Sequence, residues 1–465
     1  MSMGKRRQER QGELWIAANS LLSTPAHPFY SRLSAVLDKH GFDESVEAAC
    51  RPYYAEAKGR PSIPPGVYFR MLMIGYFEGI DSERGICWKV GDSRSLGAFL
   101  GLGPAEAGPT HVSLANTRRR LPVETHQEVF NHVLVILSKE GLLRGKTLGI
   151  DATTLEANAA LRSLVRKDTG DDYQEYLRKL AEASGIETPT KDDLIRFDRA
   201  RKGKKLSNDD WKHPHDPDAR VGMTKQGACD MIHKCETASD LDTGAVVSIC
   251  VHAGDLGDTT TVKETLAVAS ANLESVGELD VDAFFSLPTF PASEVVTDKG
   301  YHSGEVLEYL DGELVRSYIS EPERGRRQWK GKEEVRDLTY ANRRRVKGKR
   351  GKSLFRLRAE LCERGFAHLF TTGGMRRVYL RLHENIIKRV LIHACGFNLG
   401  LVMRKLYKSG TPRMMAEKLA ALSAALLQIT LIFLHAFIPS EFVVGFSSKN
   451  LSTNNSMNRH TRIGT

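Results

Sequence analysis

Two short apolar segments, each leading into an aspartate, constrain the fold of this chain more than any other feature. Residues 146–151 read KTLGID, and residues 294–298 read EVVTD. Such runs predict strands, and a carboxylate at the tip of a buried strand needs a cation or a metal ion nearby. Taken singly, each aspartate could equally begin a turn. Together they predict a sheet that holds Asp151 and Asp298 at the strand tips, as a two-metal phosphodiester site requires.

A helix predicted near residues 354–369 offers a third carboxylate. Its apolar stripe has helical spacing and comprises Phe355, Ala359, Cys362, Phe366 and Leu369. Glu363 lies on the face of this stripe, so we expect it to be buried and to act as a metal ligand. Glu360 instead has Arg356 and Arg364 four residues away on either side. That arrangement is typical of an exposed ladder of ion pairs, which makes Glu363 the better candidate.

The formal net charge of +10 and the pI near 9.1 indicate an acidic partner, with nucleic acid ahead of an anionic membrane surface. Residues 324–352 hold thirteen Lys and Arg against three Asp and Glu, with Trp329 and Tyr340 between them. A charge run is usually only solvated, but this one follows the candidate site in sequence, so we predict DNA contact. The residues assigned to it are Arg326, Arg327, Lys330, Arg343, Arg344, Arg345, Lys347 and Arg350.

Helical periodicity with Gly and Pro punctuation extends from about residue 13 to residue 140. Residues 67–76 predict an apolar helix, and residues 109–120 begin with capping residues and end in three arginines. The arginines are Arg118, Arg119 and Arg120. A basic helix suits docking on a DNA backbone, although a solvated face fits the composition equally well. We therefore predict an all-α N-terminal domain, residues 1–140, for DNA binding or dimerisation.

The remaining chain divides by composition into two parts. Residues 141–412 predict an α/β domain, with a strand at 245–251 and a helix near 262–273. This domain includes the basic segment 324–352 and a charged, solvated insertion at 162–220.

Residues 413–465 contain an uncharged run of 20 residues at 419–438. The run is long enough to cross a bilayer, but Ser423, Gln428 and Thr430 interrupt it. We expect a helix that is buried or that forms a dimer, and no membrane association.

Cysteine usage and the N-terminal composition favour a cytoplasmic protein. No apolar signal peptide follows the basic N-terminus. The seven cysteines are scattered and contain no CxxC pair, which excludes a disulfide framework and a zinc ribbon. Cys229, His233 and Cys235 are close in sequence but match no standard ligand spacing.

Three motifs resemble the acidic motifs of DDE transposases from bacterial insertion sequences. They are GIDATTLEANAA with Asp151, VVTDKGYH with Asp298 and LRAELCERGFAHL with Glu363. The segments RRQWKGKEEVRDLTYANRRRVKGKRGKSLFRLRAE and GGMRRVYLRLHENIIKRVLIHACGFNLGLVMR are also similar to that group. The N-terminal PYYAEAKGRPSIPPGVYFRMLMIGYFEG resembles its helical domain. The resemblance extends from about residue 11 to residue 412, and it departs from the family pattern at 279–292 and in the tail from 440.

The resemblance implies an α/β fold of the RNase H-like class, a mixed sheet flanked by helices, behind an all-α N-terminal domain. It implies Mg²⁺ or Mn²⁺ bound by Asp151, Asp298 and Glu363, with double-stranded DNA as the substrate and a homodimer as the synaptic complex. By analogy, Lys299, Tyr301 and His302 would support DNA or the second aspartate. Two other functions remain open from the sequence: an RNase H-like host nuclease, and a DNA-binding protein without catalytic activity.

Overall fold

The computed structural model describes Met3 and residues 27–437, except for 57–58, 104–105, 203–206, 225–226, 280–291, 324 and 326. The chain forms two compact units, one up to Gly410 and one from Thr411 onward. Each unit is described by itself.

Seven helices with short connections make up the described residues before the sheet. They are α1 Pro28–Lys39, α2 Phe42–Cys50, α3 Pro65–Phe77, α4 Glu83–Gly91, α5 Arg94–Phe99, α6 His111–Arg120 and α7 Val123–Lys139. Helix α3 contains the predicted apolar segment and is buried from Pro65 to Tyr76, with proline at its first turn. Helix α6 begins where the capping residues predict, because the Thr110 hydroxyl accepts from the backbone N–H of Ser113 (3.3 Å).

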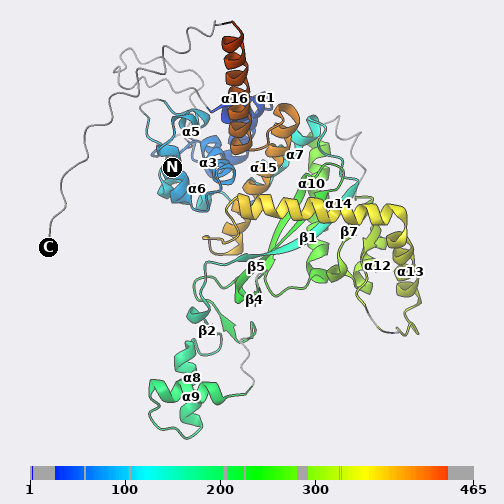
Figure 1. The fold of residues 1–465 in the computed structure, drawn as a ribbon. Coiled ribbons are helices and arrows are strands. Elements are labelled where there is room, and N and C mark those ends of the chain that lie inside the picture. Colours follow the sequence, from blue (N-terminus) through cyan, green and yellow to red (C-terminus); the bar gives the residue numbers. More distant parts are fainter. Residues whose placement is uncertain are drawn as a thin grey trace, which may run out of the picture. The chain divides into compact units, whose positions relative to one another are not determined.

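A mixed sheet lies at the centre of the first unit (Figure 1). Its strands are β1 Thr147–Glu156, β4 Arg220–Met223, β5 Cys229–Asp240, β6 Val246–Ala253, β7 Glu294–Thr297 and β8 Arg316–Ile319. Strand β5 pairs antiparallel with β1 on one side, and with β6 and β4 along the other. Strand β7 pairs parallel with β1, and β8 pairs parallel with β7. Strands β1, β5 and β6 thus form an antiparallel series, and β7 and β8 run parallel to β1.

Helices flank both faces of this sheet. On one face lies α10, Asp258–Leu279, where the Ser248 hydroxyl donates to the Thr265 carbonyl (3.0 Å). On the other lies α14, Lys349–Phe366, which crosses the strands in Figure 1 and packs Leu354 against Val296 and Tyr318. Helices α12, Gly304–Gly312, and α13, Glu333–Lys347, complete the part around β8.

Helix α15, His383–Tyr407, joins the helical region to the sheet. It is buried along most of its length and contacts α3, α7 and β6. The Asn398 side chain bonds both backbone groups of Val246, at 2.9 and 2.8 Å. Because α15 follows the sheet in sequence but packs on the N-terminal helices, the two parts share one hydrophobic core. The predicted boundary at residue 140 between a helical domain and an α/β domain stays a prediction.

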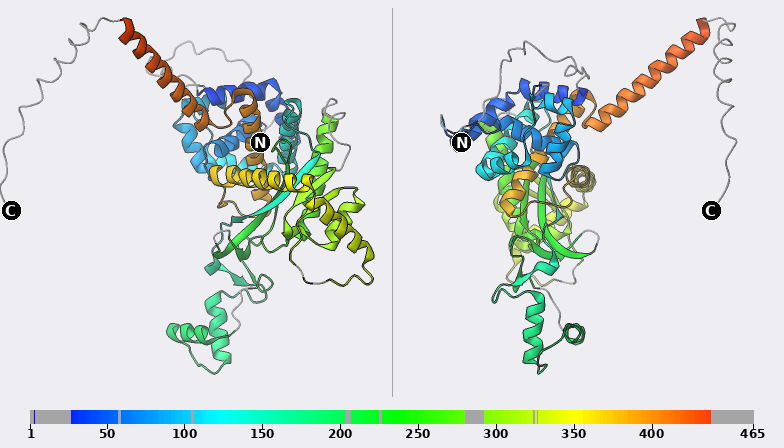
Figure 2. Two further views of the ribbon diagram at one scale, coloured as in Figure 1. Left: turned by 45° about the vertical axis from the view of Figure 1, so that its right-hand side comes forward. Right: turned by 90° about the vertical axis from the view of Figure 1, so that its left-hand side faces the viewer.

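The charged segment between β1 and β5 extends away from the sheet. It carries the short strands β2 Val165–Arg166 and β3 Trp211–Lys212, and the helices α8 Tyr173–Ala183 and α9 Lys191–Ala200. Both views in Figure 2 show α8 and α9 beyond the end of the sheet. No residue of α9 is buried, whereas Leu177, Ala181 and Trp211 of the same insertion are, so the insertion predicted to be solvated contains buried residues of its own.

The second unit consists of α16, Pro412–Phe437, in its described part. The predicted helix is present, and residues 416–433 are all exposed. By length and composition, one helical stretch of the described chain could span a membrane, and its apolar window is unburied. Dimer formation through this run stays a prediction.

Candidate active site

The two predicted aspartates lie side by side on neighbouring strands. Strands β1 and β7 are parallel and in register at Leu148 with Val295 and at Gly149 with Val296. Two residues further along both strands, the same register brings Asp151 opposite Asp298. Adjacent strands lie about 4.8 Å apart, so these carboxylates project from neighbouring positions.

One expectation for Asp151 is corrected by the structure. The residue does not end a strand, because β1 continues to Glu156 and pairs with β5 throughout. The predicted strand at 146–151 is thus the first half of a longer one. Asp298 does follow the end of β7, where its carboxylate accepts from the Gly300 N–H (2.8 Å) and caps a short 3₁₀ turn.

A guanidinium from α14 bridges the two aspartates. Arg358 Nη2 lies 2.9 Å from Asp151 Oδ1 and 3.6 Å from Asp298 Oδ2. The two carboxylate oxygens are therefore no farther apart than the sum of these distances. The Arg358 side chain is only 11% exposed, against 20% for Asp151 and 44% for Asp298. A cation thus stabilises both carboxylates from the buried side while they stay open to solvent.

The residues after Asp298 divide between solvent and core. Lys299 is exposed beside the aspartate, whereas Tyr301 and His302 are buried. The Tyr301 hydroxyl donates to Glu236 Oε1 (2.8 Å). Burial, followed by the charge of Glu236, raises the pKa of Tyr301 well above its ordinary value, so the hydroxyl stays a donor. Of the three residues predicted to support DNA or the second aspartate, Lys299 is thus the exposed one.

A second carboxylate cluster lies on the opposite face of the sheet, under α10. Glu236 on β5 is fully buried and accepts from Thr261, Thr265 and Tyr301, at 2.9, 2.5 and 2.8 Å. Lys234 Nζ lies 3.7 Å from Glu236 Oε1 and 2.6 Å from Asp258 Oδ1. Every donor around Glu236 is thus supplied by the protein, and the cluster anchors the turn behind Asp298.

Glu363 does not lie on the buried face of α14. It is exposed, as is Ala359, so its predicted burial is wrong, although Cys362, Phe366 and Leu369 of the predicted apolar stripe are buried. The side chains toward the sheet are Leu354, Arg358, Cys362 and Phe366. Cys362 Sγ lies 3.8 Å from the Gly149 carbonyl, and burial with the nearby Asp151 charge raises its pKa to about 12. Glu363 follows this cysteine directly in the chain and is exposed.

The predicted exposed pairing of Glu360 is found with one of its two arginines. Arg364 Nη1 lies 3.3 Å from Glu360 Oε1, and both side chains are largely exposed. No group of three His, Cys, Asp or Glu close enough to hold a metal occurs among the described residues. The structure therefore assembles Asp151 and Asp298, but not a triad with Glu363, and Cys229, His233 and Cys235 do not form a metal site.

The basic segment 324–352 forms α13 and the start of α14, and many of its cations have partners inside the protein. Arg327 and Arg343 both pair with Glu321, at 2.6 and 2.5 Å. The hydrogen bond from Arg343 is the main cause of a lowered pKa at Glu321. Arg345 donates to the Ser317 carbonyl (2.9 Å).

Other cations of this segment project into solvent. Lys330, Arg344 and Lys347 are exposed, whereas Arg350 donates Nε to Glu294 Oε1 (2.9 Å). Arg326 lies outside the described residues. The segment is thus partly a structural brace for β7 and β8 and partly a solvated basic surface.

The three arginines that end α6 have different surroundings. Arg118 pairs with Glu83 (2.8 Å) and donates to the Asn385 side chain (2.7 Å). Arg120 stacks over the ring of Tyr54. Arg119 is exposed, and of the three it is the one presented to solvent.

Sequence reasoning missed Arg358, Lys234 and Glu236. Arg358 could have been found from its spacing, because it lies four residues after Leu354 and four before Cys362. Lys234 and Glu236 belong to a strand too polar to be recognised from apolar alternation. Their alternate spacing was the available signal, since residues two apart share a face of a strand.

Comparison with known proteins identifies part of this chain. Residues 18–120 match a family described as Transposase domain (DUF772). No curated protein and no solved structure matches the chain. The matched segment contains α1 to α6 and ends at Arg120, and the match supports a transposase, an enzyme of DNA cleavage and strand transfer.

Proposed function

We propose that this chain is a DDE-type transposase that cleaves DNA at the ends of a mobile element and joins the freed 3′-hydroxyl to target DNA. The observation that carries the proposal is the pair Asp151 and Asp298, at one level on adjacent strands and bridged by one guanidinium. The match of residues 18–120 to a transposase domain supports the same function. Glu363, exposed on α14, is the proposed third acid.

The strand order supports an RNase H-like class for the catalytic part. An antiparallel three-stranded meander followed by two parallel strands brings β1 to the middle of the sheet, next to β7. Such an arrangement holds Asp151 within one strand and Asp298 directly after the end of the next, and such rigid elements favour precise positioning of reacting groups.

The residues present fit Mg²⁺ or Mn²⁺. Magnesium is commonly held by one or two carboxylates together with substrate phosphates, and Asp151 and Asp298 supply two, both partly exposed. The close contact with Arg358 shows that the pair favours a cation. The chemistry that such an ion supplies when bound is activation of the attacking oxygen and stabilisation of the leaving oxygen.

The protein's own groups bind and position the DNA in this proposal. Lys299 is exposed beside Asp298 and would contact a phosphate near the scissile bond. Tyr301, fixed by Glu236, holds the turn that carries Lys299. The exposed cations Lys330, Arg344 and Lys347 would bind the backbone of element-end or target DNA, and a homodimer would hold two ends together.

The test is metal-dependent cleavage of linear DNA that carries the gene with its genomic flanks. Asp151→Asn and Asp298→Asn should each lower the rate on the order of a thousand-fold, because several kcal/mol of transition-state stabilisation are lost. DNA binding should persist in both. The matched control is Asp311→Asn, an exposed aspartate on α12, which should cleave normally.

Wild-type cleavage in either site variant would overturn the proposal. A supercoiled plasmid added as target separates the remaining functions. Cleavage without joined products would indicate a host nuclease, and DNA binding without any cleavage would indicate a protein that only binds DNA.

A further inference from the structure

A groove of about 400 Å³ lies between the end of α6 and the loop that leads into α15. We propose that this groove binds one strand of the phosphate backbone of duplex DNA from the element end, a site separate from the basic segment 324–352. The inference rests on the proposed function. The residues that matter are Arg118, Arg119, Asn158, His215, Tyr379 and Arg381.

The positive charge of the groove is available to a ligand. Arg119 and Arg381 line the groove, and Arg377 lies beside it on the same loop as Arg381, with its guanidinium 5.9 Å from the ring centre of the groove residue Tyr379. All three are exposed, and no ion pair with a carboxylate is found for them within the described part of the chain. In the basic segment, by contrast, Arg327 and Arg343 are both paired with Glu321. Guanidinium groups without carboxylate partners are the ones that bind phosphate in a bidentate manner.

The loop that carries these arginines is fixed by its backbone. Arg376 and Val378 bond to both backbone groups of Glu156, at 3.0 and 2.8 Å, which extends the sheet at the end of β1. Asn158 Nδ2 donates to the Tyr379 carbonyl (2.9 Å), and Arg381 Nε donates to the Asn158 carbonyl (3.3 Å). These bonds leave the Nη groups of Arg381 for a ligand.

The far side of the loop is held by buried polar groups. Leu382 has a φ of 70°, an unfavourable value for a branched residue, and its N–H donates to Asp216 Oδ1 (3.0 Å). Asp216 and His233 are fully buried, with His233 Nε2 3.4 Å from Asp216 Oδ2. His233 Nδ1 lies 3.1 Å from His383 Nε2. Strain that a buried network maintains is typical of ligand-binding loops.

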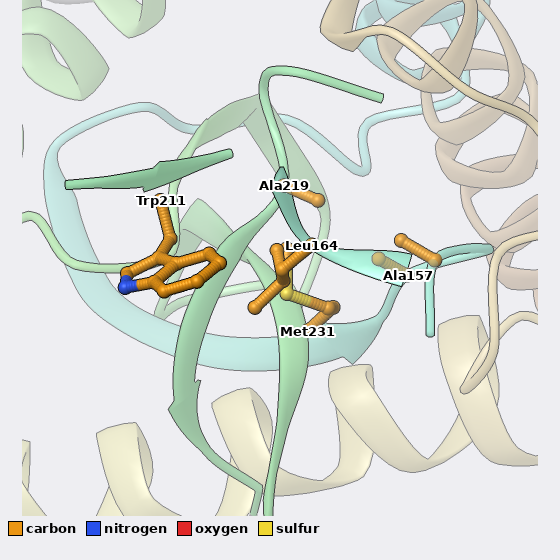
Figure 3. Close-up of a cluster of buried hydrophobic side chains, with 6 residues drawn as sticks. Ala157, Leu164, Trp211, Ala219 and Met231 are labelled. Atoms are coloured by element: carbon orange, nitrogen blue, oxygen red, sulfur yellow. The ribbon is translucent and has the colours of Figure 1, made fainter. Parts of the chain in front are cut away.

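The opposite wall is braced by the base of the insertion. Figure 3 shows Ala157, Leu164, Trp211, Ala219 and Met231 gathered in one apolar cluster. This cluster fixes the chain on either side of the groove residues Asn158 and His215. The groove is therefore formed before a ligand arrives.

Its distance from the acids fits a continuous duplex. Glu156 lies five residues beyond Asp151 on β1, roughly 17 Å at about 3.3 Å per residue. That length corresponds to about five base pairs, since phosphates on one strand are spaced about 3.4 Å along the axis. Arg119 comes from the segment that matches a transposase domain, and Asp151 comes from the sheet. DNA cut at the acids would therefore pass through the groove within one helical turn, which favours the element end over target DNA.

The experiment measures binding of the full-length protein to a fluorescein-labelled duplex of arbitrary sequence and about 30 base pairs, across a salt series. The double variant Arg377→Gln/Arg381→Gln should bind about ten-fold more weakly, and its log–log salt slope should be shallower by about two. The matched control is Arg196→Gln/Arg199→Gln on α9, two exposed arginines in the insertion. The control should keep wild-type affinity and slope.

Hydroxyl-radical footprinting on the element-end DNA should show loss of protection about five base pairs from the cleavage site in the groove variant only. Unchanged binding in the groove variant, or equal losses in the control, would overturn the inference. A loss confined to a single-stranded probe or to target DNA would also overturn it. Each of these outcomes leaves the Asp151 and Asp298 cleavage results intact, whereas a wild-type protein that cleaves no DNA would remove the proposed function itself.

Discussion

The two faces of the sheet carry two acidic clusters of opposite character. Under α10, Glu236 is fully buried and receives three hydroxyl groups, with Lys234 nearby. Under α14, Asp151 and Asp298 share a single guanidinium and remain open to solvent. A carboxylate whose hydrogen-bonding capacity is filled by the protein has nothing left for a ligand, whereas a partly exposed pair keeps open coordination positions. We therefore infer that the cluster around Glu236 supports the fold, and we propose that Asp151 and Asp298 take part in the reaction.

The largest expected effect on stability comes from the buried cluster around Glu236. Glu236→Ala should lower the free energy of unfolding by about 3–5 kcal/mol, because three hydroxyl donors and Lys234 lose a buried acceptor. Glu236→Gln keeps an acceptor oxygen and should cost less. Asp151→Ala, the matched change on the open face, should cost less, about 1–2 kcal/mol, because Arg358 keeps Asp298 as a partner. Urea unfolding of the three variants measures the difference, and equal losses for Glu236→Ala and Asp151→Ala would remove the distinction between the faces.

A smaller effect, on activity rather than stability, separates the two glutamates of α14. Glu363→Gln should lower metal-dependent cleavage by about a hundred-fold, since it removes the charge of the proposed third acid, and should leave thermal stability unchanged because the side chain is exposed. Glu360→Gln, its matched control one helical turn earlier, loses only an exposed pair with Arg364 and should be nearly silent. An active Glu363→Gln beside an inactive Glu360→Gln would reverse the assignment of the third acid.

The sequence predicted the face that carries Asp151 and Asp298 better than the face that carries Glu236. Strand β7, helices α3, α6 and α10 and the position of Asp298 follow from apolar periodicity and capping residues. Strand β5 was not predicted, because Lys234 and Glu236 are buried only through partners from α10 and from the turn after β7. A local pattern cannot show such partners, since they are distant in sequence.

The predicted burial of Glu363 on α14 is wrong for a related reason. An apolar stripe through Ala359 predicted a buried Glu363, but alanine adds little burial energy, and Arg358 takes the inner position instead. An arginine is stable there only because Asp151 and Asp298 meet it. Its place on the inner face could be read from its spacing with Leu354 and Cys362, but the two aspartates that stabilise it there are brought together only by the pairing of two strands.

The smallest expected effect concerns Arg358, whose guanidinium bridges Asp151 and Asp298. Its guanidinium occupies the side from which a positive charge stabilises both carboxylates, so it should compete with a divalent ion for them. Arg358→Gln should therefore bind Mn²⁺ several-fold more tightly than the wild type in titration calorimetry without DNA, an effect of about 1 kcal/mol. Arg364→Gln, on the exposed side of the same helix, controls for the loss of charge and should leave Mn²⁺ affinity unchanged. If Mn²⁺ bound more weakly to Arg358→Gln, Arg358 would instead be holding the two aspartates in a geometry that the metal needs.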